Sequence, residues 1–216
     1  LSHSSAASDV YKRQLLETSE NDFQYIVKYA DEVKSQIHGP DISFVVNRNI
    51  NYTNICSFKC NFCAFSKGKG HDDLRGKPYN ISEEEIIRRT KEAIDRGATE
   101  VCLQGGIHPK FSGETYLDIV RAIRSVSDSI HIHAFSPLEI DHGRKTLNIS
   151  VKDFLIELKN VGLNSLPGTA AEILHDDIRA IICPDKLNSN EWVEIIKAAH
   201  SVGLPTTSTM MFGHVE

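Results

Sequence analysis

The sequence predicts an α/β protein with the architecture of an incomplete (β/α) barrel. From residue 40 onward, extended apolar runs alternate with amphipathic segments that carry helix start and stop signals, an order typical of a parallel sheet or barrel. The chain has 216 residues, 40% hydrophobic and 25% charged, so its composition is that of a globular protein long enough to bury a core. Cysteine, glycine and histidine motifs follow the expected strands, where (β/α) barrels carry their functional groups.

Five segments have the extended, apolar character of strands. The first covers residues 42–47 and leads into a long cysteine-rich loop. The second covers residues 99–103, and the third covers residues 130–135. The fourth is short and enters residues 166–168, and the fifth covers residues 206–211. Because no sixth unit follows, we expect the barrel to be truncated after the fifth strand.

Helix signals separate these strands. Ser82 precedes three glutamates in a capping-box pattern, and the apolar period that follows ends at Gly97. Ser150 begins another helix, which ends at Gly162. Two more helices are indicated by their apolar faces, one with Tyr116, Leu117, Val120 and Ile123, the other with Trp192, Ile195, Ile196 and Ala199 before Gly203.

The chain divides into three parts. Residues 1–14 resemble translated sequencing-adapter sequence, so we interpret them as a non-native, disordered extension; a natural disordered terminus is the alternative. Residues 15–39 are expected to form an N-terminal helical segment, and residues 40–216 the partial barrel. An open strand edge and uncovered apolar faces would destabilise such a barrel. We therefore expect these 216 residues alone to fold poorly and to be inactive.

Composition and charge exclude several classes of partner. The formal net charge is -5 and the basic residues are scattered, which argues against nucleic acid. No window approaches the ~18–20 uninterrupted apolar residues of a membrane span. A cluster of cysteine thiolates, described next, implies the cytoplasm or another reducing compartment, although an organelle-targeting segment upstream would lie outside this sequence.

A cysteine triplet dominates the loop after the first expected strand. Cys56, Cys60 and Cys63 follow the spacing C-x3-C-x2-C, which suits a 4Fe-4S cluster with one iron left open. A zinc site would require a fourth ligand, for which His71 is the nearest candidate, and unliganded buried thiols are the remaining alternative. Two further cysteines stand in apolar contexts and are expected to be core thiols, namely Cys102 and Cys183.

Together with the triplet, four other segments resemble the radical S-adenosylmethionine superfamily. Within that superfamily, they are similar to the subgroup of deazaflavin and futalosine-pathway enzymes. The futalosine enzymes typically carry PGGGAE where residues 167–174 read PGTAAEIL, a form that resembles the tyrosine-using half of FO synthase, a 4-hydroxyphenyl transferase. The resemblance covers residues 40–216, and the four segments are residues 47–54, 104–109, 131–139 and 206–214.

The resemblance implies a fold, cofactors and a reaction. The fold is a (β/α)6-type, TIM-like barrel, and the cofactors are a 4Fe-4S cluster on Cys56, Cys60 and Cys63 and S-adenosyl-L-methionine on the open iron. The implied reaction cleaves L-tyrosine and adds its 4-hydroxybenzyl group to 5-amino-6-(D-ribitylamino)uracil, a step towards coenzyme F(420). The implied partners are these two substrates, an electron donor, and the other FO synthase subunit or fused half.

The resemblance also implies roles for individual residues. Phe62 matches an aromatic position near the adenine of the cofactor, and Gly105 and Gly106 match a glycine motif at its methionine end. Candidates for catalysis are His108, Glu139 and Glu172. Candidates for binding substrate are two histidines that share one side of their strand, with satisfied core histidines as the equal alternative, namely His131 and His133.

Two other functions compete with this interpretation. A futalosine-pathway radical enzyme of menaquinone biosynthesis shares most of the motifs, but the PGTAAEIL segment argues against it. A non-catalytic zinc-binding module would contain zinc in place of iron and acid-labile sulfide. Metal and sulfide content therefore separates the zinc module from the two enzymes.

Overall fold

The computed structural model describes residues 17, 19–64 and 77–215, which form two compact units. The expectation for residues 1–14 therefore lies outside the described residues. In the first unit, which ends at Phe44, helix α2 (Glu20–His38) ends at Gly39. With a φ of 72°, Gly39 donates its backbone N–H to the Ser35 carbonyl at 3.0 Å, which closes the last turn of the helix.

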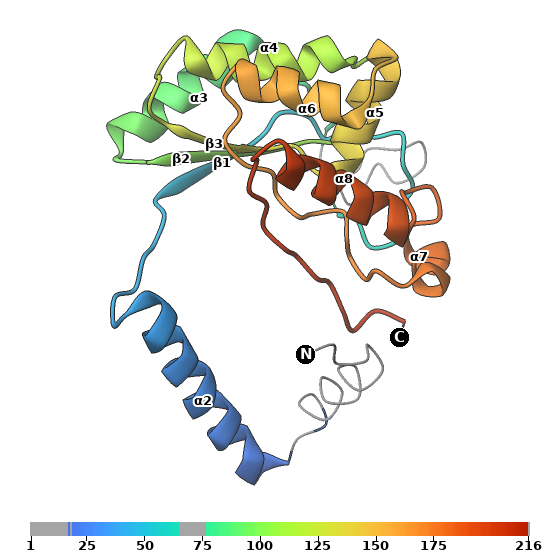
Figure 1. Ribbon diagram of the computed structural model, residues 1–216. Coiled ribbons are helices and arrows are strands. Elements are labelled where there is room, and N and C mark those ends of the chain that lie inside the picture. The colour runs from blue at the N-terminus through green and yellow to red at the C-terminus, as the bar shows by residue number, and fades with distance from the viewer. Residues whose placement is uncertain (1–16, 18, 65–76, 216) are drawn as a thin grey trace. The chain divides into compact units, whose positions relative to one another are not determined.

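The second unit, residues 45–216, contains a parallel three-stranded sheet in the order β1-β2-β3 (Figure 1). The register aligns Asn49 of β1 with Cys102 of β2, and Cys102 in turn with His133 of β3. Isolated parallel bridges from His133 to Ser165 and from Leu166 to Thr206 extend this pairing. The result is an α/β unit with an open parallel sheet of β1 (Asn47–Asn51), β2 (Glu100–Gln104) and β3 (His131–Ala134).

The predicted first strand is wrong in position. Residues 42–46 are not in a strand, and Ile42 and Phe44 are 86% and 84% exposed. The strand instead follows the alternating segment NRNIN, whose Ile50 is fully buried. The position of the strand thus follows the burial of Ile50 on one face, whereas the prediction had followed a continuous apolar run.

The predicted fourth and fifth strands are reduced to bridges. Leu166 N–H donates to the Pro205 carbonyl and Thr207 N–H to the Leu166 carbonyl, both at 3.0 Å. The next donor of this ladder, the Gly168 N–H, binds the Thr207 hydroxyl at 3.0 Å instead of a backbone carbonyl, so regular pairing stops there.

Within its described residues, the second unit has six helices, several of which cover one face of the sheet (Figure 1). The four predicted helices are confirmed, with Ser82 and Ser150 capping α3 and α6. Two helices were not predicted, because the residues after β3 and after Glu172 were interpreted as loops. The helices are α3 (Glu83–Asp95), α4 (Gly113–Arg124), α5 (Pro137–Leu147), α6 (Val151–Asn160), α7 (Asp176–Ile182) and α8 (Ser189–Ser201).

The core lies between the sheet and the helices on one of its faces (Figure 1). Side chains that alternate towards this face are fully buried, and each Val, Leu or Ile among them contributes about 1.5–3 kcal/mol to the free energy of unfolding. They are Ile50, Val101, Leu103, Ile132 and Ala134. None of the helices in the described residues is long and apolar enough to span a membrane.

Candidate radical and substrate site

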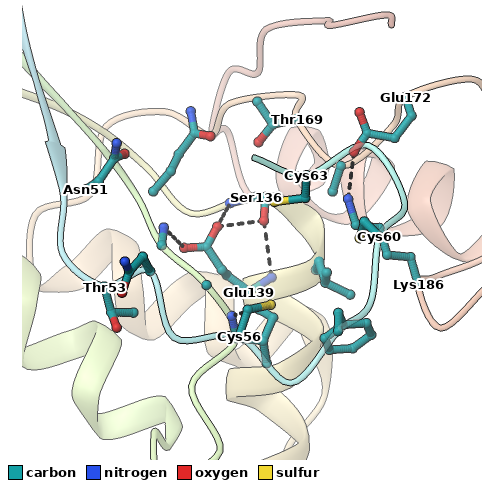
Figure 2. Close-up of a pocket in the computed structure, with 18 of the residues that line it drawn as sticks. Asn51, Thr53, Cys56, Cys60, Cys63, Ser136, Glu139, Thr169, Glu172 and Lys186 are labelled. Atoms are coloured by element: carbon teal, nitrogen blue, oxygen red, sulfur yellow. Dashed lines mark hydrogen bonds and ion pairs between the residues drawn. The ribbon is translucent and has the colours of Figure 1, made fainter. Parts of the chain in front are cut away.

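A cavity of about 370 Å³ lies at the carboxyl ends of the strands (Figure 2). Its volume falls in the range of ~300–1,000 Å³ typical of small-molecule sites. The wall combines the end of β1, the cysteine loop, the loop after β2, the start of α5, and two segments around Glu172 and Lys186. Elements far apart in the sequence thus meet at the sheet edge where parallel α/β folds bind ligands.

The three cysteines of the triplet all line this cavity and are half-buried. The sulfur of Cys56 accepts the backbone N–H of Ile107 at 3.3 Å, which fastens the loop to the end of β2. Burial raises the pKa of Cys60 to about 11, so a metal must displace the proton of this thiol when it binds. Three thiols on one cavity wall are a donor set that fits a 4Fe-4S cluster, although no three ligand side chains within the described residues are arranged around a single metal position.

The glycine pair after β2 allows the cysteine loop to approach the sheet closely. A Cβ on Gly106 would lie 2.3 Å from the Ile55 carbonyl oxygen and 2.8 Å from the Cys56 Cβ. A Cβ on Gly105 would lie 2.3 Å from the Tyr52 ring. The sequence predicted that both glycines let the cofactor come close to the backbone. The structure shows that they also let the loop that carries the cysteines come close to the end of β2.

Glu139 lies at the base of the cavity and is 1% exposed. One carboxylate oxygen accepts the Ser136 N–H at 2.7 Å and the Ser136 hydroxyl at 2.6 Å. The other accepts the Gly105 N–H at 3.2 Å and the Tyr52 hydroxyl. Burial raises the pKa of Glu139, while these donors act in the opposite direction. The Glu139 carboxylate therefore links the segment after β1, the segment after β2 and the start of α5. Both of its oxygens already accept hydrogen bonds.

Glu172 forms an ion pair with Lys186 at 2.6 Å, on the side of the cavity near Cys60 (Figure 2). The two side chains are only 12% and 11% exposed. The Lys186 ammonium also lies 5.2 Å from the centre of the Phe62 ring, a cation–π contact. Charge in this cavity is therefore concentrated beside the cysteine loop.

The structure brings most of the predicted site residues together. The cysteines, Phe62, Gly105, Gly106, Glu139 and Glu172 all line the cavity. His108, by contrast, stacks on the Phe111 ring at 4.7 Å and does not line the cavity. His131 and His133 also lie outside it, and both contact the Ser165 hydroxyl, at 2.7 and 2.6 Å. These two histidines share one side of β3, as predicted.

Sequence reasoning missed several residues that line the cavity. Lys186 lacked any local motif, because its partner Glu172 is 14 residues away. Asn49, Asn51 and Gln104 received no role, although the alternation of asparagine with Arg48 and Ile50 in NRNIN signals a polar strand face.

Comparison with known proteins identifies the family of the chain and its relatives. The sequence profile described as the Radical SAM superfamily matches residues 50–216. The chain is 46% identical to the 5-amino-6-(D-ribitylamino)uracil–L-tyrosine 4-hydroxyphenyl transferase of Methanothermobacter thermautotrophicus, over 94% of this chain and 54% of that protein. It is 48% identical to the transferase of the same name from Archaeoglobus fulgidus, over 88% and 53%. It is 47% identical to the FO synthase of Mycobacterium leprae, over 88% and 22%. The chain thus spans about half the length of the separate transferases.

Solved structures support the fold independently of sequence. The crystal structure of HydG, a maturase of the [FeFe]-hydrogenase, aligns with a TM-score of 0.68 at 17% identity, over 92% of this chain and 42% of that one. Methylornithine synthase (PylB) aligns with a TM-score of 0.66 at 16% identity, over 90% and 52%. With the profile match over most of its length, the chain belongs to the Radical SAM superfamily.

Proposed function

We propose that the protein uses radical chemistry to transfer the 4-hydroxybenzyl group of L-tyrosine to 5-amino-6-(D-ribitylamino)uracil. The observation that carries the proposal is the 46–48% identity to curated transferases of that activity over 88–94% of this chain. The cysteine triplet and its cavity are consistent with it. In this reaction the Cα–Cβ bond of tyrosine breaks, the benzyl carbon bonds to the uracil, and the remainder leaves as 2-iminoacetate.

Cys56, Cys60 and Cys63 would hold a 4Fe-4S cluster, and its fourth iron would bind S-adenosyl-L-methionine. When bound, the two supply the one-electron chemistry that makes a 5'-deoxyadenosyl radical. Phe62, beside Cys63 on the same wall, covers this region with an apolar ring that limits the access of water. Gly105 and Gly106 leave bare backbone at the cavity surface.

Glu172 and Lys186 would bind the zwitterionic end of an amino acid. Their opposite charges match an α-ammonium and an α-carboxylate, which S-adenosyl-L-methionine and tyrosine both carry. Because the two side chains neutralise each other at 2.6 Å, neither charge is buried without a partner.

Glu139 would act as a positioning residue. Both of its oxygens already accept hydrogen bonds from Ser136, Gly105 and Tyr52, so its role is to hold these donors in place. His108, which packs on Phe111 outside the cavity, and the Ser165-bound His131 and His133 would then support the structure rather than contact substrate.

We also infer a setting for the protein. The match to 22% of an FO synthase supports a partner subunit or fused half that performs another part of FO formation. The open sheet would belong to a (β/α)6-type barrel whose wall continues through the bridges at Ser165 and Leu166. An electron donor and a reducing compartment are needed to keep such a cluster active.

The test is anaerobic reconstitution with iron and sulfide, followed by mass spectrometry of the products. With both substrates and S-adenosyl-L-methionine present, we expect 5'-deoxyadenosine and a uracil that carries the 4-hydroxybenzyl group. If futalosine-pathway substrates are consumed and tyrosine is not, the enzyme is of the menaquinone type. If the purified protein binds zinc and neither iron nor sulfide, the proposal is wrong.

A further inference from the structure

One face of the sheet is polar where it meets the cavity. Asn49 and Asn51 alternate on β1 with Arg48 and Ile50, and the register places Asn51 beside Gln104 of β2. These three amides line the cavity. Every Asn and Gln amide offers a donor and an acceptor, so this edge of the sheet presents several neutral hydrogen-bonding groups to whatever fills the space.

These groups are largely without partners inside the described part of the chain. No hydrogen bond within it uses the side chains of Asn49 or Asn51, and Gln104 reaches only the Cys102 sulfur, at 3.8 Å. Thr169 adds a second, independent observation: its hydroxyl oxygen is buried, has no hydrogen-bond partner there, and belongs to a residue of the cavity wall. A buried polar atom without a partner costs stability, and a bound ligand can supply the missing hydrogen bond.

The cavity therefore has two chemically different sides. Figure 2 shows Asn51 well separated from the Glu172–Lys186 pair, with Thr169 between them. The charged side suits the ammonium and carboxylate of an amino acid. The polar wall, which we define as Asn49, Asn51, Gln104 and Thr169, carries no formal charge and suits a neutral ligand with many donors and acceptors.

We propose that the polar wall binds the uracil substrate and determines specificity for it. This inference rests on the proposed function and adds the residues that read one of its two substrates. A uracil ring is neutral and presents an alternating carbonyl, N–H and carbonyl edge, which amide side chains complement; the ribityl hydroxyls can use the remaining donors and acceptors. Tyrosine, with two charges at one end, belongs to the Glu172–Lys186 side.

The test is an anaerobic equilibrium titration of 5-amino-6-(D-ribitylamino)uracil into the reconstituted protein and its variants, without turnover. We expect Asn51→Ala and Gln104→Ala to weaken binding about tenfold each, and Thr169→Val, which keeps the shape, roughly 2- to 10-fold. Thr169→Ser should restore most of the affinity. Asn47→Ala is the matched control, because Asn47 lies on the same face of β1 but outside the cavity lining, and it should bind like the unsubstituted protein.

Two further readouts separate ligand recognition from a structural role. The Thr169→Val protein without ligand should melt at or above the temperature of the unsubstituted protein, because it loses an unpartnered buried hydroxyl. The Michaelis constant for tyrosine should change less than twofold in all of these variants.

The outcomes distinguish the two proposals. If the unsubstituted protein binds the aminouracil and none of the polar-wall variants weakens it, the further inference is wrong and the proposed function stands. If the variants instead weaken tyrosine or S-adenosyl-L-methionine, the polar wall has been assigned to the wrong ligand. If the unsubstituted reconstituted protein binds no aminouracil, the proposed function fails and the inference fails with it.

Discussion

The two faces of the three-stranded sheet are built from the same strands, but one face packs into the hydrophobic core and the other lines the cavity. On the helix side, Leu103 and Ile132 are fully buried in the core. On the cavity side, Asn51 and Gln104 face open space. Because successive residues of a strand point to opposite faces, adjacent positions in the sequence carry stability and chemistry in alternation. Substitutions on either face should therefore separate folding from ligand binding.

The largest effect is expected at the loop where the cavity side meets the cysteines. Cys60→Ala should abolish both the iron–sulfur cluster and all formation of 5'-deoxyadenosine, because it removes one of the three thiolates that would hold the cluster. Cys102→Ala is the matched control: Cys102 lies on the cavity side of the sheet but does not line the cavity. Iron and sulfide analysis with visible absorption measures both. A normal 4Fe-4S spectrum in the Cys60 variant would show that the cysteine triplet does not hold the cluster.

The next effect is expected on the helix side. Ile132→Ala should lower the free energy of unfolding by about 2–5 kcal/mol, because the side chain is 0% exposed and its removal leaves a cavity. Asn49→Ala, on the opposite face, should change it by no more than about 0.5 kcal/mol. Chemical denaturation of the two variants checks the difference. Equal losses of stability in the two variants would show that the two faces contribute equally to the free energy of unfolding.

A smaller stability effect, with a sharp consequence for the metal, is expected at the glycine pair. Gly106→Ala places a Cβ 2.3 Å from the Ile55 carbonyl oxygen, and backbone cannot move aside as a flexible side chain would. We expect a loss of about 1–3 kcal/mol and a lower iron content, because the neighbouring Cys56 must shift. A Gly106→Ala protein with full iron content and unchanged stability would mean that the cysteine loop is not held by this contact.

The smallest effect concerns pH. Burial raises the folded-state pKa of Glu139 above its usual value near 4.5, so this group favours the folded state most below the unfolded-state pKa. Its contribution is lost as pH rises through the folded-state pKa. Relative to Glu139→Gln, which does not titrate, the unsubstituted protein should lose stability as pH increases from about 4.5 upward, before the difference levels off. A difference that grows with pH would show that the surrounding donors outweigh burial.

What the sequence predicted well is what short segments determine by themselves. The capping serines Ser82 and Ser150 identified the starts of α3 and α6, because a cap needs only the next few residues. The cysteine spacing pointed to the Radical SAM superfamily for the same reason, and the family match over residues 50–216 confirms that assignment. The start of α5 had the same kind of signal in Ser136 and Glu139, a complete capping box, but a catalytic interpretation of the carboxylate obscured it.

What the sequence did not predict depends on contacts between distant segments. The position of β1 follows from the burial of Ile50 against helices formed much later in the chain. The Glu172–Lys186 pair depends on the fold of the segment between them, which includes α7. The unpartnered Thr169 hydroxyl is visible only once its surroundings are known. Each of these belongs to the cavity or decides its shape, so the site was less predictable than the helices.

The most direct test of the account measures two properties of the same pair of variants, Asn51→Ala and Leu103→Ala. Thermal denaturation gives the stability of each, and anaerobic titration gives its affinity for 5-amino-6-(D-ribitylamino)uracil. The account predicts that Asn51→Ala binds about tenfold more weakly with an unchanged melting temperature, while Leu103→Ala melts earlier and, when folded, binds normally. An Asn51→Ala protein that binds normally, or a loss of both properties in both variants, would contradict it.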